Sequence, residues 1–208
     1  ERFFVAIKNL LIHESPKIRA LAIENLYFLK SENLSFQIET MVNDRDQQVT
    51  TAAFRYLLKK YGEDTIDLFD KYLNRKDDTI ANAALIGLSL ELRNHPLLQN
   101  RFDLEKRIQL ALQQSEELIS EEQKTYKIQA ILEAIGNARA ENFYHILNEQ
   151  LHSKNQTIQN TAILSSAKTL DKIFIPQLID FLSGKDTRKT AIDALYSYGE
   201  PINDILVK

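Results

Sequence analysis

Apolar residues recur along this chain with the spacing of one helix face, and a helical phrase of about eleven residues returns several times. In the clearest copies the first residue is apolar, and small or apolar residues follow four and eight positions later, which places them in one stripe along an α-helix. The intervals between copies are 31, 31, 47, 31 and 29 residues. A period of this length predicts an array of stacked helical units. The copies begin at Ile18, Val49, Ile80, Lys127, Ile158 and Thr187.

The second copy shows how one unit is built. Residues 34–42 follow the apolar rhythm of an amphipathic helix, and the polar residues 43–46 interrupt it. Asp46 is placed to cap the next helix, and Gly62 is placed to end it, because glycine tolerates the conformation that follows a helix terminus. We expect Asp64 to start the helix after that. Each unit is therefore predicted to be a hairpin of an outer helix A and a second helix B.

The predicted B helices share small residues near their centres, which would let neighbouring helices approach closely. A single hairpin leaves most of its apolar face in water, so the hairpins are expected to stack on one another. The sequence thus predicts an all-α solenoid of about six helical hairpins. The central small residues are Ala22, Ala53, Ala84, Ala130, Ala162 and Ala191.

Two segments carry a resemblance to a known family. The pattern D-x-x-V-x-x-A-A at residues 46–53, and D-x-T-I-x-x-A-A at residues 77–84, resemble the second helix of HEAT repeats. Residues 134–140 are similar to the junction between helix B and the next helix A in that family. Arg19 and Arg188 match the arginine that usually follows the first position. The resemblance implies a right-handed superhelix with A helices on the convex side and B helices lining the concave side.

We expect a single repeat domain over residues 1–208, as a fragment of a longer protein. The fourth unit holds about sixteen more residues than its neighbours, between positions 93 and 122. Lengthened helices with a longer surface loop are one explanation, and an extension used in recognition is another. The expected units are approximately 1–31, 32–62, 63–93, 94–139 with the insertion, 140–170 and 171–199, with a partial unit at 200–208.

Composition narrows the class of protein. The 208 residues carry a formal net charge of −3, without any block of five like charges, so the sequence does not indicate a basic nucleic-acid binder. It lacks cysteine, signal-peptide pattern and any apolar run near the roughly 18 residues that span a bilayer. We expect a soluble, cytoplasmic module. HEAT segments in bacteria also occur joined to membrane transporters and sensors, which leaves membrane tethering through a fused domain open.

No residue set indicates catalysis, so we expect a protein that is not an enzyme and has no cofactor. No serine has the context of a nucleophile, and every glycine stands alone, which excludes a phosphate-cradling loop. His145, Glu149 and His152 share one side of a predicted helix, but a fourth metal ligand is missing. Paired carboxylates such as Glu116 and Glu117 are read as solvated. No metal site is predicted.

If the B helices line a groove, fixed positions in each unit should face a partner. They form a mixed polar strip with scattered apolar residues, which suits a peptide or protein partner of unknown identity. Charge reversal at Arg55 and Lys59 is expected to weaken its capture, and Tyr27 or Phe28 could supply an aromatic anchor. The predicted groove residues are Thr51, Arg55, Tyr56, Lys59, Asn82, Ile86, Gln129, Glu133, Asn137, Asn160, Lys168, Lys189 and Asp193.

Other functions stay open beside the protein-interaction scaffold. A nucleic-acid-binding HEAT-like solenoid is the main alternative, but it needs a continuous line of Lys and Arg, which Glu24, Glu133 and Asp193 interrupt. A purely structural spacer without a binding partner is the second alternative.

Overall fold

The computed structural model describes residues 2–29, 34–74, 78–93 and 95–199, and every regular element in these ranges is a helix. The expected all-α class is thus confirmed. The chain divides into two compact units, Glu1–Arg107 and Ile108–Lys208, and the division falls inside helix α8 (Leu104–Glu117).

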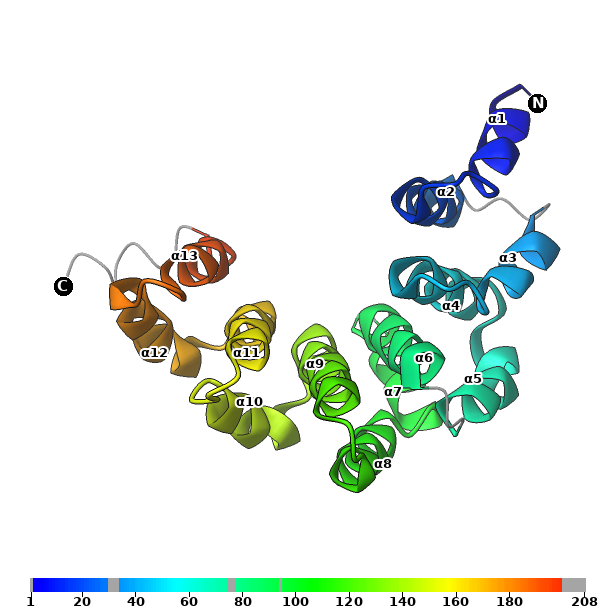
Figure 1. Ribbon diagram of the computed structural model, residues 1–208. Coiled ribbons are helices and arrows are strands. Elements are labelled where there is room, and N and C mark those ends of the chain that lie inside the picture. The colour runs from blue at the N-terminus through cyan, green and yellow to red at the C-terminus, as the bar shows by residue number, and fades with distance from the viewer. Residues whose placement is uncertain (1, 30–33, 75–77, 94, 200–208) are drawn as a thin grey trace. The chain divides into compact units, whose positions relative to one another are not determined.

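The first unit consists of two layers of helices (Figure 1). In one layer α4 contacts both α2 and α6, and in the other layer each shorter helix packs against the long helix that follows it. This alternation matches the predicted order of A and B helices. The B layer contains α2 (Pro16–Leu29), α4 (Gln47–Tyr61) and α6 (Asp78–Leu92), and the A layer contains α1 (Arg2–Leu10), α3 (Ser35–Met41) and α5 (Ile66–Leu73).

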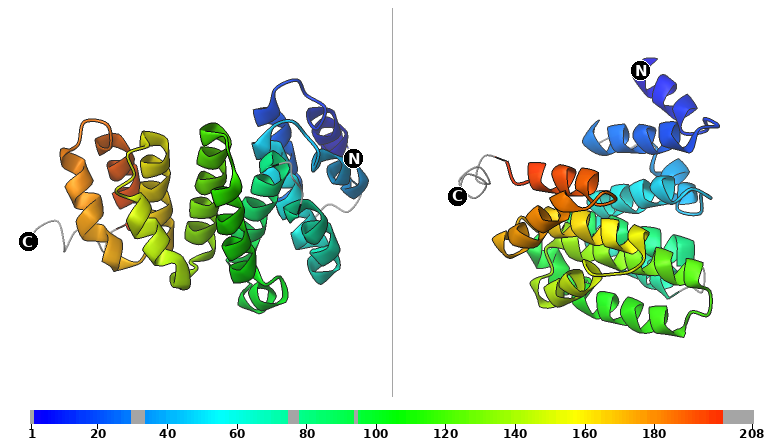
Figure 2. Two further views of the ribbon diagram at one scale, coloured as in Figure 1. Left: turned by 60° about the horizontal axis from the view of Figure 1, so that its bottom comes forward. Right: turned by 60° about the vertical axis from the view of Figure 1, so that its left-hand side comes forward.

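The second unit repeats the same order, and two further views show its helices from other directions (Figure 2). Its central B helix, α11, contacts both α9 and α13, while α10 and α12 pack against α11 and α13 from the A side. Short 3₁₀ turns precede α10 and α12. The B layer contains α9 (Glu121–Ala138), α11 (Gln156–Thr169) and α13 (Arg188–Tyr196), and the A layer contains α10 (Tyr144–Gln150) and α12 (Ile175–Asp180).

Helix α4 begins and ends where the sequence predicts. The Asp46 carboxylate accepts hydrogen bonds from the backbone N–H groups of Gln48 (2.9 Å) and Val49 (3.3 Å), which have no partner within the helix. Gly62 follows the last turn with φ 55°, a conformation that disfavours a side chain. The expected helix start at Asp64 is wrong, because a 3₁₀ turn covers Gly62–Thr65 and α5 begins only at Ile66.

Close backbone approach explains the small residues of the B helices. The six central alanines are all buried. A Cβ atom at Gly87 of α6 would lie 2.9 Å from the Thr51 carbonyl oxygen of α4, and one at Gly136 of α9 would collide with the Ser165 backbone of α11. Helices this close leave no room for larger side chains, so the small residues set the spacing within each B layer.

The turn after helix A is fixed by one ion pair in the first unit. The Arg19 guanidinium donates two hydrogen bonds to the Asp44 carboxylate, at 2.9 and 2.8 Å, and one each to the carbonyls of His13 and Glu14. Burial opposes the charge on Asp44, but hydrogen bonds from Arg19 and from backbone N–H groups outweigh it and lower the pKa of this carboxyl below 3.8. Arg19 therefore links α2 to the turn of the next hairpin.

The extra residues of the fourth predicted unit are helical. They form α7 (Pro96–Arg101) and the long helix α8, and only residues 118–120 separate α8 from α9. The expected longer surface loop is therefore wrong. The added length lies in helices because apolar positions such as Leu104, Ile108 and Ala111 supply a buried stripe along α8.

Candidate functional site

The C-terminal parts of three B helices meet in the first unit and carry a group of polar and aromatic side chains. Tyr27 comes from the last turn of α2, Arg55 and Lys59 from α4, and Glu91 from the end of α6. They come together because α2, α4 and α6 pack side by side, although up to 64 positions separate them in the sequence. The cluster thus depends on the stacking of successive hairpins.

Glu91 is the centre of this cluster. Its side chain is only 4% exposed, and one carboxylate oxygen accepts hydrogen bonds from the Tyr27 hydroxyl at 2.7 Å and from Arg55 Nε at 3.4 Å. His95 Nε2 lies 3.6 Å from the other oxygen. A buried carboxylate is costly unless donors surround it, so these contacts are what permit a charge at this position.

The Tyr27 ring contacts two cations of α4. The Arg55 guanidinium lies 4.4 Å from the centre of the Tyr27 ring, and Lys59 Nζ lies 3.6 Å from it. Such contacts are attractive because the ring face carries negative charge. The pKa of the Tyr27 hydroxyl is raised, first by burial and then by its hydrogen bond to Glu91. The ring therefore stays neutral and fixed under both cations.

An exposed aromatic ring completes the cluster. Phe28 packs edge to face against Tyr27, with ring centres 5.2 Å apart, yet 71% of its surface is exposed. Lys59 is exposed as well, and among the described residues no carboxylate pairs with it. We call Phe28, Arg55 and Lys59, with Tyr27 beneath them, the aromatic–cation surface. Of the two expected anchors, Phe28 is the accessible one.

The predicted groove residues of the first unit fall into two groups. Arg55 is partly exposed, Thr51 is of intermediate exposure and Lys59 is exposed. Buried instead are Tyr56 at 3%, Asn82 at 2% and Ile86 at 5%. Successive residues lie about 100° apart around a helix, so the side chain next to a groove position turns toward a neighbouring helix. These three buried side chains offer no surface to a partner, and we leave them out of the proposed site.

The B helices of the second unit carry polar residues that bind each other. Glu133 of α9 and Lys168 of α11 form an ion pair at 3.6 Å, with both side chains about one-third exposed. Gln129 donates a hydrogen bond of 3.0 Å to the Thr161 hydroxyl. The predicted residue Asn137 is buried, at 2% exposure, and joins the excluded group.

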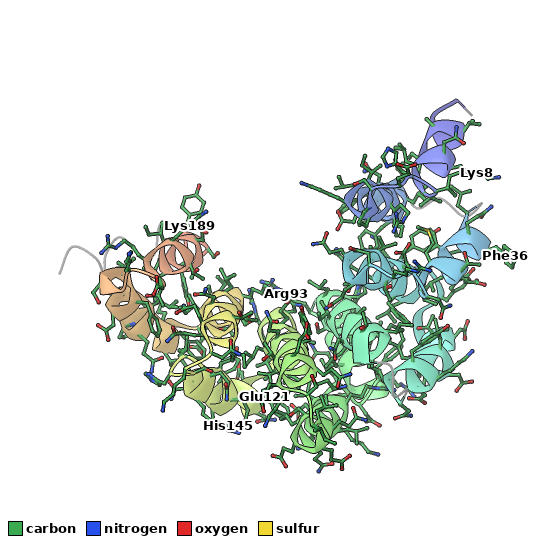
Figure 3. All side chains as sticks on the ribbon, viewed as in Figure 1. Lys8, Phe36, Arg93, Glu121, His145 and Lys189 are labelled. Carbon is green, nitrogen blue, oxygen red and sulfur yellow. The ribbon has the colours of Figure 1, made fainter. Side chains whose placement is uncertain are left out.

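The remaining predicted residues of this unit lie at its surface. Asn160 accepts a hydrogen bond of 3.1 Å from Gln156, its neighbour along α11. Lys189, labelled in Figure 3, and Asp193 are exposed on α13. These residues form a polar face, and Tyr196 on the same helix α13 is 87% exposed, though no cation of the described residues lies over its ring as Lys59 lies over Tyr27.

Sequence reasoning found the cations but missed the carboxylate that orients Arg55. Glu91 is the charged residue near the end of an otherwise apolar helix, and this is the signal that could have identified it. Its hydrogen-bond donor, Tyr27, lies two predicted hairpins earlier in the sequence, so no local pattern joins the two residues. The metal candidates His145, Glu149 and His152 are all exposed.

The described ranges contain no group of three or more His, Cys, Asp or Glu side chains placed to hold a metal ion. None of the helices in the described part of the chain combines the length and apolar character needed to cross a bilayer. No protein-family model matches the sequence, and no curated protein matches it significantly.

Proposed function

We propose that this chain is a HEAT-like helical repeat module that binds a protein partner, without catalysis, through the outward face of its B helices. The observation that carries the proposal is Lys59, whose ammonium group lies over Tyr27 beside the exposed ring of Phe28, with no described carboxylate to neutralise it. An exposed aromatic ring beside fixed cations has the composition of an interface anchor, where aromatic residues and arginine supply most binding energy.

Preorganisation supports this reading. Binding normally costs side-chain entropy, because flexible residues must adopt one conformation in the complex. The buried Glu91 restrains Arg55 and Tyr27, and the Tyr27 ring restrains Lys59. A partner that meets this surface therefore orders fewer groups, and a larger part of the contact energy remains as affinity.

We also propose that the hairpins of this chain stack as a right-handed HEAT-like superhelix, as the resemblance implies. The same alternation of A and B helices in both units supports this. Small-angle X-ray scattering can test it, because a compact chain of this length has a radius of gyration of about 17 Å. An elongated module should exceed that value clearly, and a value near it would contradict the proposal.

Nucleic acid is the less favoured partner. Exposed carboxylates at Glu24 and Asp193 lie on the same series of helix positions as the cations, so a phosphate backbone would meet repulsion along the track. Titration with labelled duplex DNA at about 50 and about 200 mM salt separates the two classes of partner. Affinity that collapses over this range would favour DNA binding.

The experiment that tests the proposed function uses two exposed phenylalanines of the first unit. Phe28 is 71% exposed on the B helix α2, and Phe36 is 76% exposed on the A helix α3. The immobilised chain is used to capture proteins from an extract of its source cells, as wild type, Phe28→Ser and Phe36→Ser. A partner retained by wild type and Phe36→Ser, but lost with Phe28→Ser, is expected. Equal retention by all three would overturn the assignment.

A further inference from the structure

The junction between α8 and α9 exposes an apolar side chain that local folding does not explain. Ile119 lies between the two helices and is 98% exposed, more than any other large apolar side chain in the described ranges. It belongs to the segment that interrupts the 31-residue period. Exposing an isoleucine so completely leaves its apolar surface in water, and contact with a partner would remove that surface from water.

The backbone around Ile119 is held by a helix cap. The Ser120 hydroxyl accepts a hydrogen bond from the Gln123 backbone N–H at 3.4 Å, at the start of α9. The residue before such a cap usually packs against the fourth residue of the helix. Here that fourth residue is Lys124, which gives Ile119 no apolar partner of this kind. Its side chain is therefore presented on an ordered junction and left uncovered.

Four carboxylates flank Ile119 in the sequence. Glu116 and Glu117 end α8, and Glu121 and Glu122 begin α9; all four are exposed and lack an ion pair with any described residue (Glu121 is labelled in Figure 3). Carboxylates favour a helix N-terminus, but at a C-terminus the helix dipole opposes them. The pair on α8 thus violates a local stability rule, which is typical of residues kept for another role. We call residues 116–122 the acidic knob.

The acidic knob and the aromatic–cation surface complement each other. One presents an exposed aliphatic side chain among unpaired carboxylates, and the other an exposed phenyl ring beside Arg55 and Lys59. On the second surface Glu91 is buried and occupied, so Glu24 is the exposed carboxylate that opposes an acidic partner. Arg55 already pairs with Glu91, so the free positive charge that an acidic partner would meet is that of Lys59.

We propose that the acidic knob of one copy binds the aromatic–cation surface of a second copy. Ile119 covers the Phe28 ring, while a carboxylate of the knob pairs with Lys59, which no described carboxylate neutralises. The assignment rests on the proposed function, because it uses the same surface and names its partner. The contact joins two different surfaces, so each added copy leaves one knob and one aromatic–cation surface free, and longer chains or rings form with rising concentration.

Sedimentation velocity on the intact chain tests this pairing. Between about 10 µM and about 1 mM the wild type should form species larger than a dimer at low salt, and these should dissociate near 0.5 M salt, where charges are screened beyond about 4 Å. Ile119→Ser and Lys59→Glu should each weaken association at least about tenfold. The matched controls Ile12→Ser and Lys154→Glu, both at exposed positions, should leave it unchanged.

A charge exchange makes the test specific. Glu116→Lys with Glu117→Lys should abolish self-association, and since both lysines favour a helix C-terminus, misfolding would not explain the loss. Mixed with Lys59→Glu chains, this double variant should form a mixed complex that neither forms alone. A wild type that stays monomeric to about 1 mM, or a mixture that fails to associate, would overturn the pairing.

The outcomes separate this inference from the function it rests on. A monomeric wild type that still captures a foreign protein through Phe28 removes the pairing and leaves the interaction module intact. Self-association that Phe28→Ser and Lys59→Glu both abolish supports the module and its partner together. Self-association that is insensitive to Phe28→Ser contradicts the aromatic–cation surface as the receiving site.

Discussion

Lys59 and Lys168 occupy the same position, ten residues after the start of their helical phrases, yet the structure gives them different neighbours. Lys59 lies over the Tyr27 ring without a described carboxylate, whereas Lys168 pairs with Glu133 at 3.6 Å. In the first unit the carboxylate, Glu91, is buried and binds Tyr27 and Arg55 instead. The repeat thus fixes where a side chain points, and the contacts with the neighbouring B helices decide whether its charge is free to bind a partner.

The largest expected effect is the loss of stability when Glu91 is removed, compared with the loss when Glu133 is removed. Glu91→Ala removes the acceptor of the half-buried Tyr27 hydroxyl and of Arg55, so unfolding should become easier by about 2 kcal/mol. Glu133→Ala removes an ion pair whose members are 36% and 37% exposed, and should cost less than about 0.5 kcal/mol. Urea unfolding followed by circular dichroism measures both. Equal losses would show that the two regions do not differ in burial of charge.

Charge reversal at Lys59 and at Lys168 should have different effects on partner binding. Lys59→Glu is expected to weaken a partner captured through Phe28 at least about tenfold, or about 1.4 kcal/mol, and Lys168→Glu to leave it within about twofold. Arg55 is a poorer choice for reversal than the sequence indicates, because a carboxylate there would face the buried Glu91. A similar loss with Lys168→Glu would place the partner on both units.

A smaller and pH-dependent effect is expected at Asp44. Asp44→Asn weakens the two hydrogen bonds from Arg19 and should cost about 1 kcal/mol at neutral pH. Since folding lowers the pKa of this carboxyl, its contribution is present above the ordinary value of 3.8 and is lost as the pH falls further below it. The difference in unfolding free energy between wild type and Asp44→Asn should therefore shrink in acid. The exposed control Asp186→Asn should match the wild type in stability. A stability difference between wild type and Asp44→Asn that widens in acid would contradict the lowered pKa of Asp44.

The smallest expected effect separates the two roles of Tyr27. Tyr27→Phe removes the hydroxyl that binds Glu91 but keeps the ring beneath Lys59, so stability should fall by about 0.5–1 kcal/mol with partner binding unchanged. Tyr27→Leu removes the ring as well and should weaken binding, because Lys59 loses its cation–π contact. Calorimetric binding and urea unfolding of both variants test this, and equal affinities would exclude a role for the ring.

The local features of the fold could be predicted because they depend on nearby residues. The cap at Asp46, the helix end at Gly62 and the buried central alanines all follow from spacing and backbone preference. The 3₁₀ turn at Gly62–Thr65 and the added helix α7 did not follow from that pattern. Both depend on how neighbouring helices pack, which periodicity does not specify.

The candidate site could be predicted only in part, for a physical reason. Helix periodicity placed Arg55 and Lys59 on the outward side of α4, but it also placed Asn82 and Ile86 on the outward side of α6, and both are buried by packing in the structure. The burial of Glu91 depends on Tyr27, which lies 64 positions earlier. Contacts of this range come from the stacking of hairpins and leave no periodic signal.

Site-specific photo-cross-linking is the most direct test of the claim that the aromatic–cation surface binds a protein. A photoreactive phenylalanine analogue replaces Phe28 on α2 in one sample and Phe36 on α3 in the other, two positions of similar exposure. The account predicts a discrete cross-linked protein product from position 28, absent from position 36 and lost when Lys59→Glu is added. Products of equal yield from both positions, or none from position 28, would contradict it.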